Sequence, residues 1–329
     1  MRITLLIICL AFLLSCNQET TQDKEHPAYQ NPTVAPLTDA IATWPDSADL
    51  YFQRSLALSK IDQDSLVLID LQKAASLAPE SVLYLNAIGY VQLNLARPDE
   101  AITAFKKSLS MVPGDLEIRL QLAQAYMENN QLEAAASQTE SLIHDAPRYL
   151  PARLMQAKLK AAHKDTVAAI QLAEAVWEQD RRYYDASLQL ADWYKAIGNP
   201  KAIDQYQFTF SLNPDDATPL FEIGRFFQQK KQWEEAKSAY KACVIADGDY
   251  TYAYIHTAEI LMQQDSLDKA QRILKLALAT SPANADAWYQ TGVCFEKMQL
   301  PDSAKQYYDQ AAYFGYDATV IRDALNRMK

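Results

Sequence analysis

Cysteine and histidine are the side chains in this sequence best suited to bind metals or to act as nucleophiles and bases. The 329 residues include four of each, at His26, His144, His163, His256, Cys9, Cys16, Cys243 and Cys294. The histidines lack the spacing of metal ligands, and neither a Gly-rich phosphate loop nor a His-Glu-x-x-His motif occurs in the sequence. We therefore expect no catalytic residues, no metal site and no cofactor, and the sequence disfavours an enzyme.

Cys16 differs from the other cysteines because an apolar run precedes it. Residues 3–14 follow Arg2, carry no charge and are too short to span a bilayer, which is typical of a signal peptide. The end of the run, Leu13-Leu14-Ser15-Cys16, resembles a bacterial lipoprotein box. This resemblance implies cleavage after residue 15 and a lipid anchor on Cys16. The alternative is an ordinary signal peptide that happens to contain Cys16.

The residues after Cys16 indicate a cellular address. By resemblance to lipoprotein sorting rules, Asn17 favours the outer membrane, and the single acidic residue Glu19 favours the periplasmic face over the cell surface. Residues 17–45 contain several prolines and no apolar periodicity. We predict a signal peptide over residues 1–15 and a lipidated, flexible tether over residues 16–45.

The composition restricts the fold of the remaining chain. Only 7 residues are glycine, which disfavours nucleotide-binding sheets, barrels and propellers, because these folds need many glycine turns. Hydrophobic residues make up 49% of the chain, enough for a core. The net charge of −10 argues against a nucleic-acid partner, since few cations would be available to neutralise phosphates.

Alanine recurs at a nearly constant interval. The intervals are 34, 34, 33, 34, 34 and 34 residues, between Ala101, Ala135, Ala169, Ala202, Ala236, Ala270 and Ala304. Prolines keep the same interval and the same irregularity, at Pro79, Pro113, Pro147, Pro214 and Pro282. We place the one missing residue at Gly198-Asn199-Pro200.

This interval and these residues resemble the tetratricopeptide repeat, a helix-turn-helix unit of 34 residues. Eight repeats would begin near Ala48, Val82, Leu116, Leu150, Tyr184, Ala217, Thr251 and Ala285. The eighth position, where the two helices of a repeat touch in this family, is small throughout: Ser55, Gly89, Ala123, Ala157, Ala191, Gly224, Ala258 and Gly292. The resemblance implies an all-α fold, a right-handed superhelical solenoid of about eight repeats over residues 46–316.

Two further expectations follow from this register. A helix over residues 317–329, N-capped by Asp317, would cover the last repeat. Cys243 and Cys294 fall on repeats that are separated by a whole repeat, so we expect two packed thiols without a disulfide.

The family geometry implies a binding surface. It places the first helix of each repeat on a concave face through repeat positions 2, 5, 6, 9, 12 and 13. In the later repeats these positions supply Asp192, Phe221, Glu222, Arg225, Gln229, Tyr252, His256, Glu259, Tyr289, Gln290 and Glu296. Tyr and Arg make good interface anchors, so we expect this groove to hold an extended peptide or a partner helix. For any single residue, a solvated helix face is the alternative interpretation.

These features predict a lipid-anchored protein–protein interaction scaffold in the bacterial cell envelope. Its concave groove would bind a partner protein or peptide and so assemble or stabilise a secretion, motility, pilus or outer-membrane assembly complex. An adaptor that recruits peptidoglycan-synthesising or degrading enzymes is the alternative. A third hypothesis, an unrecognised hydrolase or transferase, alone predicts substrate turnover.

Overall fold

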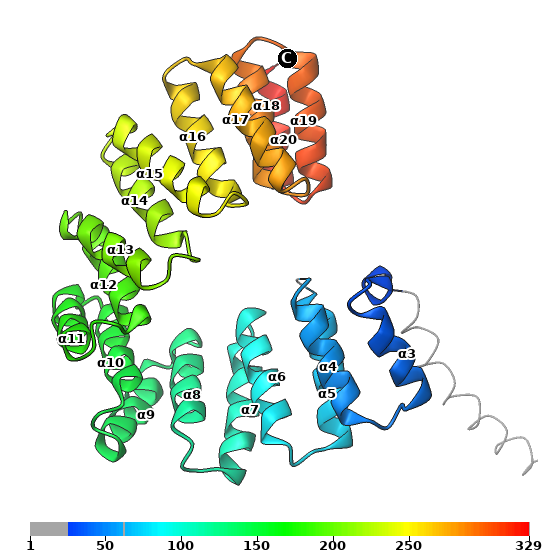
Figure 1. Cartoon of the computed structure of the whole chain (residues 1–329), viewed down its shortest axis with the longest axis vertical. Helices are drawn as coiled ribbons and strands as arrows, with labels where there is room; N and C mark the ends of the chain where they lie inside the picture. Colours follow the sequence, from blue (N-terminus) through cyan, green and yellow to red (C-terminus); the bar gives the residue numbers. More distant parts are fainter. Residues whose placement is uncertain (1–25, 62, 329) are drawn as a thin grey trace, which may run out of the picture. The chain divides into compact units, whose positions relative to one another are not determined.

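The computed structural model describes residues 26–61 and 63–328, and these residues form helices and no strand (Figure 1). The predicted signal peptide over residues 1–15 and the predicted lipidation site Cys16 lie outside the described residues. The chain divides into two compact halves, Met1–Asp165 and Thr166–Lys329. The elements are η1 (Pro27–Gln30), α3 (Ala35–Thr43), α4 (Ala48–Ser59), α5 (Asp64–Leu77), α6 (Val82–Asn94), α7 (Pro98–Met111), α8 (Leu116–Glu128), α9 (Leu132–Asp145), α10 (Leu150–Ala162), α11 (Thr166–Gln179), α12 (Tyr184–Ala196), α13 (Lys201–Leu212), α14 (Thr218–Gln229), α15 (Trp233–Ala246), α16 (Thr251–Gln263), α17 (Leu267–Thr280), α18 (Ala285–Lys297), α19 (Pro301–Tyr313) and α20 (Ala318–Arg327).

The helices of each half form a stack of hairpins, which confirms the predicted all-α solenoid of tetratricopeptide type. The first helices begin within one residue of the predicted repeat starts, from Ala48 in α4 to Ala285 in α18. In the N-terminal half, α4 packs on α5, α5 on α6, and so on to α10; in the C-terminal half the same order runs from α11 to α20. The boundary between the halves falls inside the fourth predicted repeat, between α10 and α11.

The turn inside each repeat has a fixed backbone conformation. Just after the first helix, one residue adopts φ between 54° and 67° in seven repeats: Ala96, Asn130, Lys164, Gly198, Lys231, Asp265 and Gln299. A left-handed residue at this place ends the helix and turns the chain back. In six of these repeats the periodic alanine follows five residues later, whereas Ala202 follows Gly198 by only four. The missing residue therefore lies between Gly198 and Ala202, where the sequence placed it.

The small residue at the eighth position lets the two helices of a repeat approach closely. A Cβ atom built on Gly89, Gly224 or Gly292 would lie less than 3.0 Å from a ring carbon of the second helix. The rings belong to Phe105, Tyr240 and Tyr308, all fully buried. A larger residue at these three positions would therefore force the ring opposite it to shift.

Gly224→Ala is expected to destabilise the fold by about 1–3 kcal/mol, because the new methyl group overlaps the buried Tyr240 ring and outweighs the gain in helix propensity. Gly248→Ala is the matched control, since a Cβ atom there meets nothing within 4 Å. Urea and thermal unfolding would compare the two variants with the wild type. Equal stability of the Gly224 variant would mean that the ring moves aside without cost.

Residues 26–45 are folded, which corrects this part of the tether predicted over residues 16–45. Within that range η1 and α3 pack on the first repeat, and Tyr29 and Val34 are buried there. The Arg54 guanidinium lies 4.3 Å from the centre of the Tyr29 ring and pairs with the buried Asp70, with an Nη2–Oδ1 distance of 2.6 Å. Two of the prolines that suggested a tether, Pro27 and Pro36, occupy the first turns of η1 and α3, where a missing N–H group leaves no helix hydrogen bond unmade.

At the other end, α20 covers the last repeat as predicted. The Asp317 carboxylate accepts hydrogen bonds from the N–H groups of Thr319 and Val320, at 2.7 and 3.2 Å, and so caps the helix. Ile321 and Ala324 are buried against the last repeat, in the cluster that contains Tyr308. Val320, on the same helix, is exposed.

Candidate functional site

The predicted groove residues all lie in the C-terminal half, on the first helices α12, α14, α16 and α18. We call the surface of these four helices the first-helix face. Along a helix, repeat positions 2, 6, 9 and 13 follow one stripe, whereas positions 5, 8 and 12 follow a neighbouring stripe turned toward the second helix. The two stripes have different environments in this structure.

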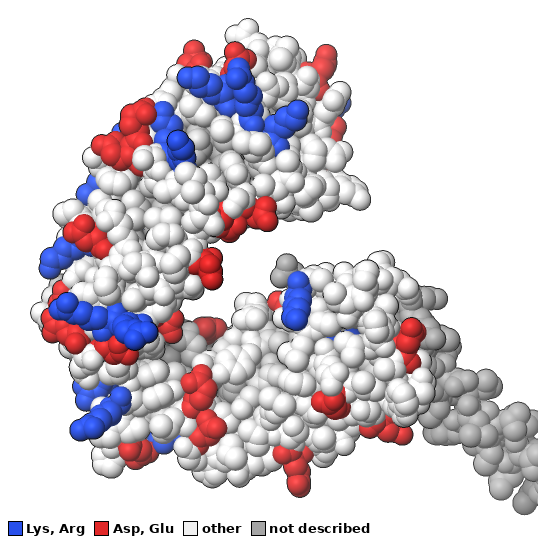
Figure 2. All heavy atoms as spheres, viewed as in Figure 1, with Lys and Arg blue, Asp and Glu red and all other residues white. Residues whose placement is uncertain are grey.

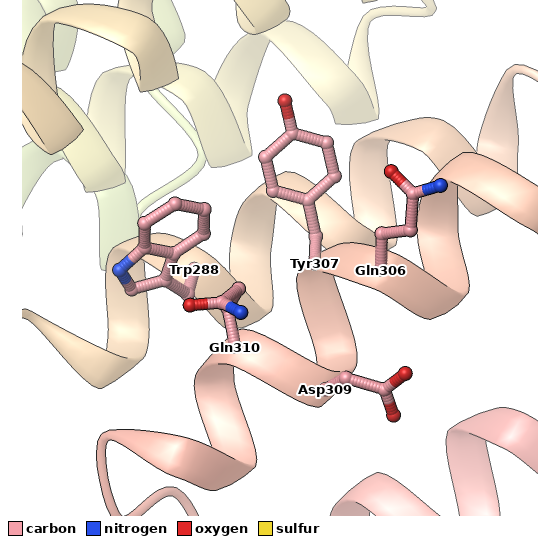
Figure 3. Close-up of a pocket in the computed structure, with 5 residues that line it drawn as sticks. All are labelled: Trp288, Gln306, Tyr307, Asp309 and Gln310. Atoms are coloured by element: carbon pink, nitrogen blue, oxygen red, sulfur yellow. The ribbon is translucent and has the colours of Figure 1, made fainter.

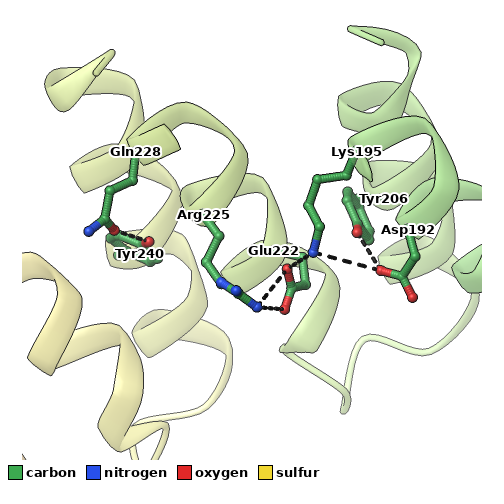
Figure 4. Close-up of polar contacts among 7 residues, drawn as sticks. All are labelled: Asp192, Lys195, Tyr206, Glu222, Arg225, Gln228 and Tyr240. Atoms are coloured by element: carbon green, nitrogen blue, oxygen red, sulfur yellow. Dashed lines mark hydrogen bonds and ion pairs between the residues drawn. The ribbon is translucent and has the colours of Figure 1, made fainter. Parts of the chain in front are cut away.

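An ion-pair cluster joins α12 to α14 (Figure 4). Glu222 lies between two cations: Lys195 from α12 pairs with it directly, and its Oε1 atom lies 3.1 Å from Nη1 of Arg225. Lys195 also lies 4.0 Å from Asp192, which accepts a hydrogen bond of 2.5 Å from the Tyr206 hydroxyl. The carboxylate of Glu222 is therefore fixed, while Asp192 and Arg225 keep 41% and 43% of their side-chain surface exposed.

A second polar cluster joins α14, α16 and α18 through Glu259. Its carboxylate accepts hydrogen bonds from the amides of Gln228 and Gln290, at 3.4 and 3.0 Å. It also lies 2.8 Å from Nδ1 of His256. Three consecutive first helices are thus linked by side chains from one stripe and its border, and the linkage holds the face in a defined shape.

One predicted groove residue belongs to the core instead. Phe221 is only 8% exposed and lies against Tyr240, Tyr250 and His256, with ring centres 5.0 to 5.6 Å apart. Tyr289, also at repeat position 5, is half-buried and stacks on Tyr316 at 4.2 Å. Position 5 lies on the stripe that faces the second helix, so Phe221 supports the surface and does not present its ring to a partner.

Only a few of the predicted groove side chains remain accessible to a partner. Arg225 and Tyr252 are exposed, whereas Asp192 is half-buried. Tyr252, at 46%, directs its hydroxyl to Asp286 over 3.3 Å. Gln229 is also exposed, at the end of α14. The face therefore offers a carboxylate, a guanidinium and a phenol on a linked framework, which suits recognition of a polar peptide or protein surface.

Sequence reasoning missed Lys195 and Gln228, which complete the two polar clusters. Both occupy repeat position 12, which the family pattern includes, so the signal was present in the sequence. Glu296, at the same position in the last repeat, was predicted and has a structural role. It accepts a 2.5 Å hydrogen bond from Tyr308 and pairs with Arg327 of α20 at 3.1 Å.

The remaining thiols match the sequence prediction. Cys243 and Cys294 are free and buried. Burial raises the pKa of the Cys243 thiol to about 12, so it stays protonated at neutral pH. In residues 26–61 and 63–328, no group of three His, Cys, Asp or Glu side chains is arranged to hold a metal ion. Over the same residues, no helix has both the length and the apolar character needed to cross a bilayer.

Two segments of the chain match family models. Residues 95–159 and residues 256–318 each match a model described as tetratricopeptide repeat. These two segments are similar to tetratricopeptide repeats. The first segment runs from the end of α6 into α10, and the second from α16 to the start of α20, so both halves contain matched repeats.

Known proteins with such repeats are similar over much of the chain. Human tetratricopeptide repeat protein 21B is 24% identical over 301 residues, covering 87% of this chain and 22% of the relative. Human DnaJ homolog subfamily C member 3 is 21% identical over 234 residues, covering 70% of this chain and 42% of the relative. The chain thus spans less than half the length of these two relatives.

Solved structures show the same fold. A tetratricopeptide repeat protein from Parabacteroides merdae has a TM-score of 0.50 at 13% identity, covering 75% of this chain and 98% of that chain. The APC/C hetero-tetramer Cut9–Hcn1 also gives a TM-score of 0.50, at 14% identity, covering 91% and 60%. The tetratricopeptide repeats indicate a protein–protein interaction scaffold.

Asp192 offers a test of the first-helix face through pH. Burial raises the pKa of its carboxyl group above the ordinary value, against the opposing effects of Tyr206 and Lys195. The folded state then binds this proton more tightly than the unfolded state, so the ionised group costs stability at pH 7 and that cost disappears as the pH falls through the raised pKa.

Asp192→Asn should therefore melt at the same temperature as the wild type or about 1–3 °C higher at pH 7, with the difference vanishing near pH 4. The asparagine oxygen can still accept the Tyr206 hydrogen bond. Glu222→Gln is the matched control, since it weakens the pairs with Lys195 and Arg225 and should lower the melting temperature. A clear loss of stability in Asp192→Asn at pH 7 would show that its charge stabilises the fold.

Proposed function

We propose that this protein is a lipid-anchored interaction scaffold in the bacterial cell envelope, attached to the outer membrane through Cys16 and facing the periplasm. Its first-helix face binds a segment of an envelope protein and so assembles or stabilises a secretion, motility, pilus or outer-membrane assembly complex. The observation that carries the binding role is the exposure of Arg225 and Tyr252, beside the half-buried Asp192, on helices tied together by Glu222 and Glu259.

The linked framework supports this role energetically. A partner that meets side chains already held in place loses less conformational entropy than one that must order them. Arg225 is fixed through Glu222 yet keeps much of its surface free, so it can form a further hydrogen bond with a partner. Tyr252 adds a large ring with a polar tip, a combination common at interface centres.

The anchor rests on the sequence alone. Its support is the apolar run of residues 3–14 followed by Leu13-Leu14-Ser15-Cys16. Because residues 26–45 are folded, the proposal no longer includes a tether of the predicted length. The segment that would connect the lipid to the fold is reduced to residues 17–25.

Cys16→Ala tests the anchor. The variant should leave the membrane fraction and appear as a folded protein in the soluble fraction, because it lacks the residue that would carry the lipid. Cell fractionation and metabolic labelling with a fatty acid would measure this, with Cys243→Ala as the control that keeps Cys16. A Cys16 variant that stays with the membrane and still incorporates label would contradict the proposal.

Arg225→Glu combined with Tyr252→Ala tests the binding face. We expect this variant to capture at least about tenfold less of each partner by crosslinking in intact cells, because two anchors are removed from one surface. Quantitative mass spectrometry would compare it with the wild type, and circular dichroism would check the fold.

The control for this experiment is Arg322→Glu combined with Tyr313→Ala, which changes one exposed Arg and one exposed Tyr on α20 and α19. This variant should retain the partners. If both variants capture the same proteins as the wild type, the first-helix face is not the binding site. The identity of the captured proteins separates an envelope assembly complex from peptidoglycan enzymes.

A further inference from the structure

A cavity of about 460 Å³ lies between the second helices α17 and α19, with α18 beneath it. Arg272, Lys275 and Leu278 of α17 form one wall, and Phe295 of α18 and Tyr307 of α19 form another. None of these residues occupies a predicted groove position, since Phe295, the one on a first helix, stands at repeat position 11. The cavity is therefore a separate candidate site.

A second cavity of about 420 Å³ adjoins it and shares Tyr307 (Figure 3). Trp288 of α18 lines this cavity together with the amides of Gln306 and Gln310 from α19. Asp309 also lines this cavity, and Figure 3 shows its carboxylate pointing away from the two rings. Two adjoining cavities with a common wall can hold an extended ligand whose successive groups enter one after the other.

The aromatic rings of the two cavities form a row. Phe295 stacks on Tyr307 at 4.9 Å, Tyr307 lies 5.6 Å from Trp288, and Trp288 stacks on Phe314 at 6.1 Å. The ring faces are thus used within the molecule, which leaves little room for a sugar or a planar ring to stack. Ring edges carry partial positive charge and favour contact with an anionic or hydrogen-bond-accepting group.

The charged residues at the rim of the cavity between α17 and α19 also favour an anionic group. Arg272 and Lys275 are exposed and stand one turn apart on α17. In the described part of the chain neither forms an ion pair, although the whole chain has a net charge of −10. Figure 2 shows basic side chains gathered over the region of α17. Two such cations at the rim of a recessed apolar cavity are complementary to an anionic group of a partner.

The equivalent place three repeats earlier supports this interpretation. A cavity between α11 and α13 is lined by Glu174, Trp177, Tyr194 and Gln205, the counterparts of Lys275, Leu278, Phe295 and Tyr307 in the repeat register. There the Glu174 carboxylate already accepts a hydrogen bond from the Tyr194 hydroxyl of the same protein. Phe295 has no hydroxyl group, and Lys275 carries the opposite charge without a partner.

We propose that the cavity between α17 and α19 binds an acidic segment of a partner protein. A carboxylate of the segment pairs with Arg272 and Lys275, and a neighbouring apolar side chain contacts Leu278 and the edges of Phe295 and Tyr307. The amides of Gln306 and Gln310 in the adjoining cavity are placed to hydrogen-bond the backbone of the segment. The recessed apolar wall favours a peptide over a flat membrane surface, which could reach only the rim.

The test measures binding of a fluorescein-labelled, C-terminally amidated peptide of alternating Glu and Leu to the full chain by fluorescence anisotropy. We expect saturable binding with a dissociation constant below about 1 mM, and the affinity should fall as NaCl is added. Arg272→Gln combined with Lys275→Gln should weaken it by about 5- to 20-fold, because two exposed ion pairs are lost. Lys160→Gln combined with Lys241→Gln is the control of equal charge and should bind like the wild type.

Three outcomes would overturn the proposal. They are no binding of the acidic peptide, equal binding of a peptide with Gln in place of Glu, and equal weakening by the two double variants. Competition by inorganic phosphate as strong as by the peptide would assign the site to a small anion. Binding to phosphatidylglycerol vesicles without binding to the peptide would assign it to a membrane, and either result also overturns the proposal.

Discussion

The close approach of two helices at the eighth position of each repeat is the constraint on which the rest of the structure depends. A glycine at this position allows an aromatic ring from the second helix to lie directly on the backbone of the first, as Tyr240 does on Gly224. That contact fixes the distance and rotation between the two helices. Once these are set, the same stripe of every first helix is turned away from the second helix, and it is on this stripe that Asp192, Arg225 and Tyr252 lie. The packing of the core therefore decides which side chains a partner can meet.

The exposed stripe is not a set of independent side chains. Glu222 joins α12 to α14, and Glu259 joins α14 to α16 and α18. Each carboxylate lies among several donors, so its partial burial is compensated. Asp192 differs, because its charge is partly buried and its pKa is raised. A carboxylate kept ionised at the expense of stability is a common feature of binding surfaces, where selection for contact with a partner overrides selection for the isolated fold.

The sequence predicted the repeat register closely because size constraints recur at fixed intervals. Small residues, alanines and prolines located the repeat starts and the single missing residue before Ala202. The N-terminal segment was misjudged because Pro27 and Pro36 were read as signs of an extended chain, although proline is equally suited to the first turn of a helix. Phe221 was misplaced for another reason. A list of repeat positions does not say toward which neighbour a large ring turns, and at position 5 the ring of Tyr240 draws Phe221 into the core.

A repeated backbone can place different chemistry at equivalent sites. The cavities between α11 and α13 and between α17 and α19 share four lining positions, yet Glu174 occupies one where Lys275 occupies the other. Because the hairpin contacts at the eighth position do not involve these residues, the charge of each cavity could change without cost to the fold. In one cavity the Tyr194 hydroxyl donates a hydrogen bond to the Glu174 carboxylate. In the other, Phe295 has no hydroxyl group, and the cations Arg272 and Lys275 are left to solvent or to a partner.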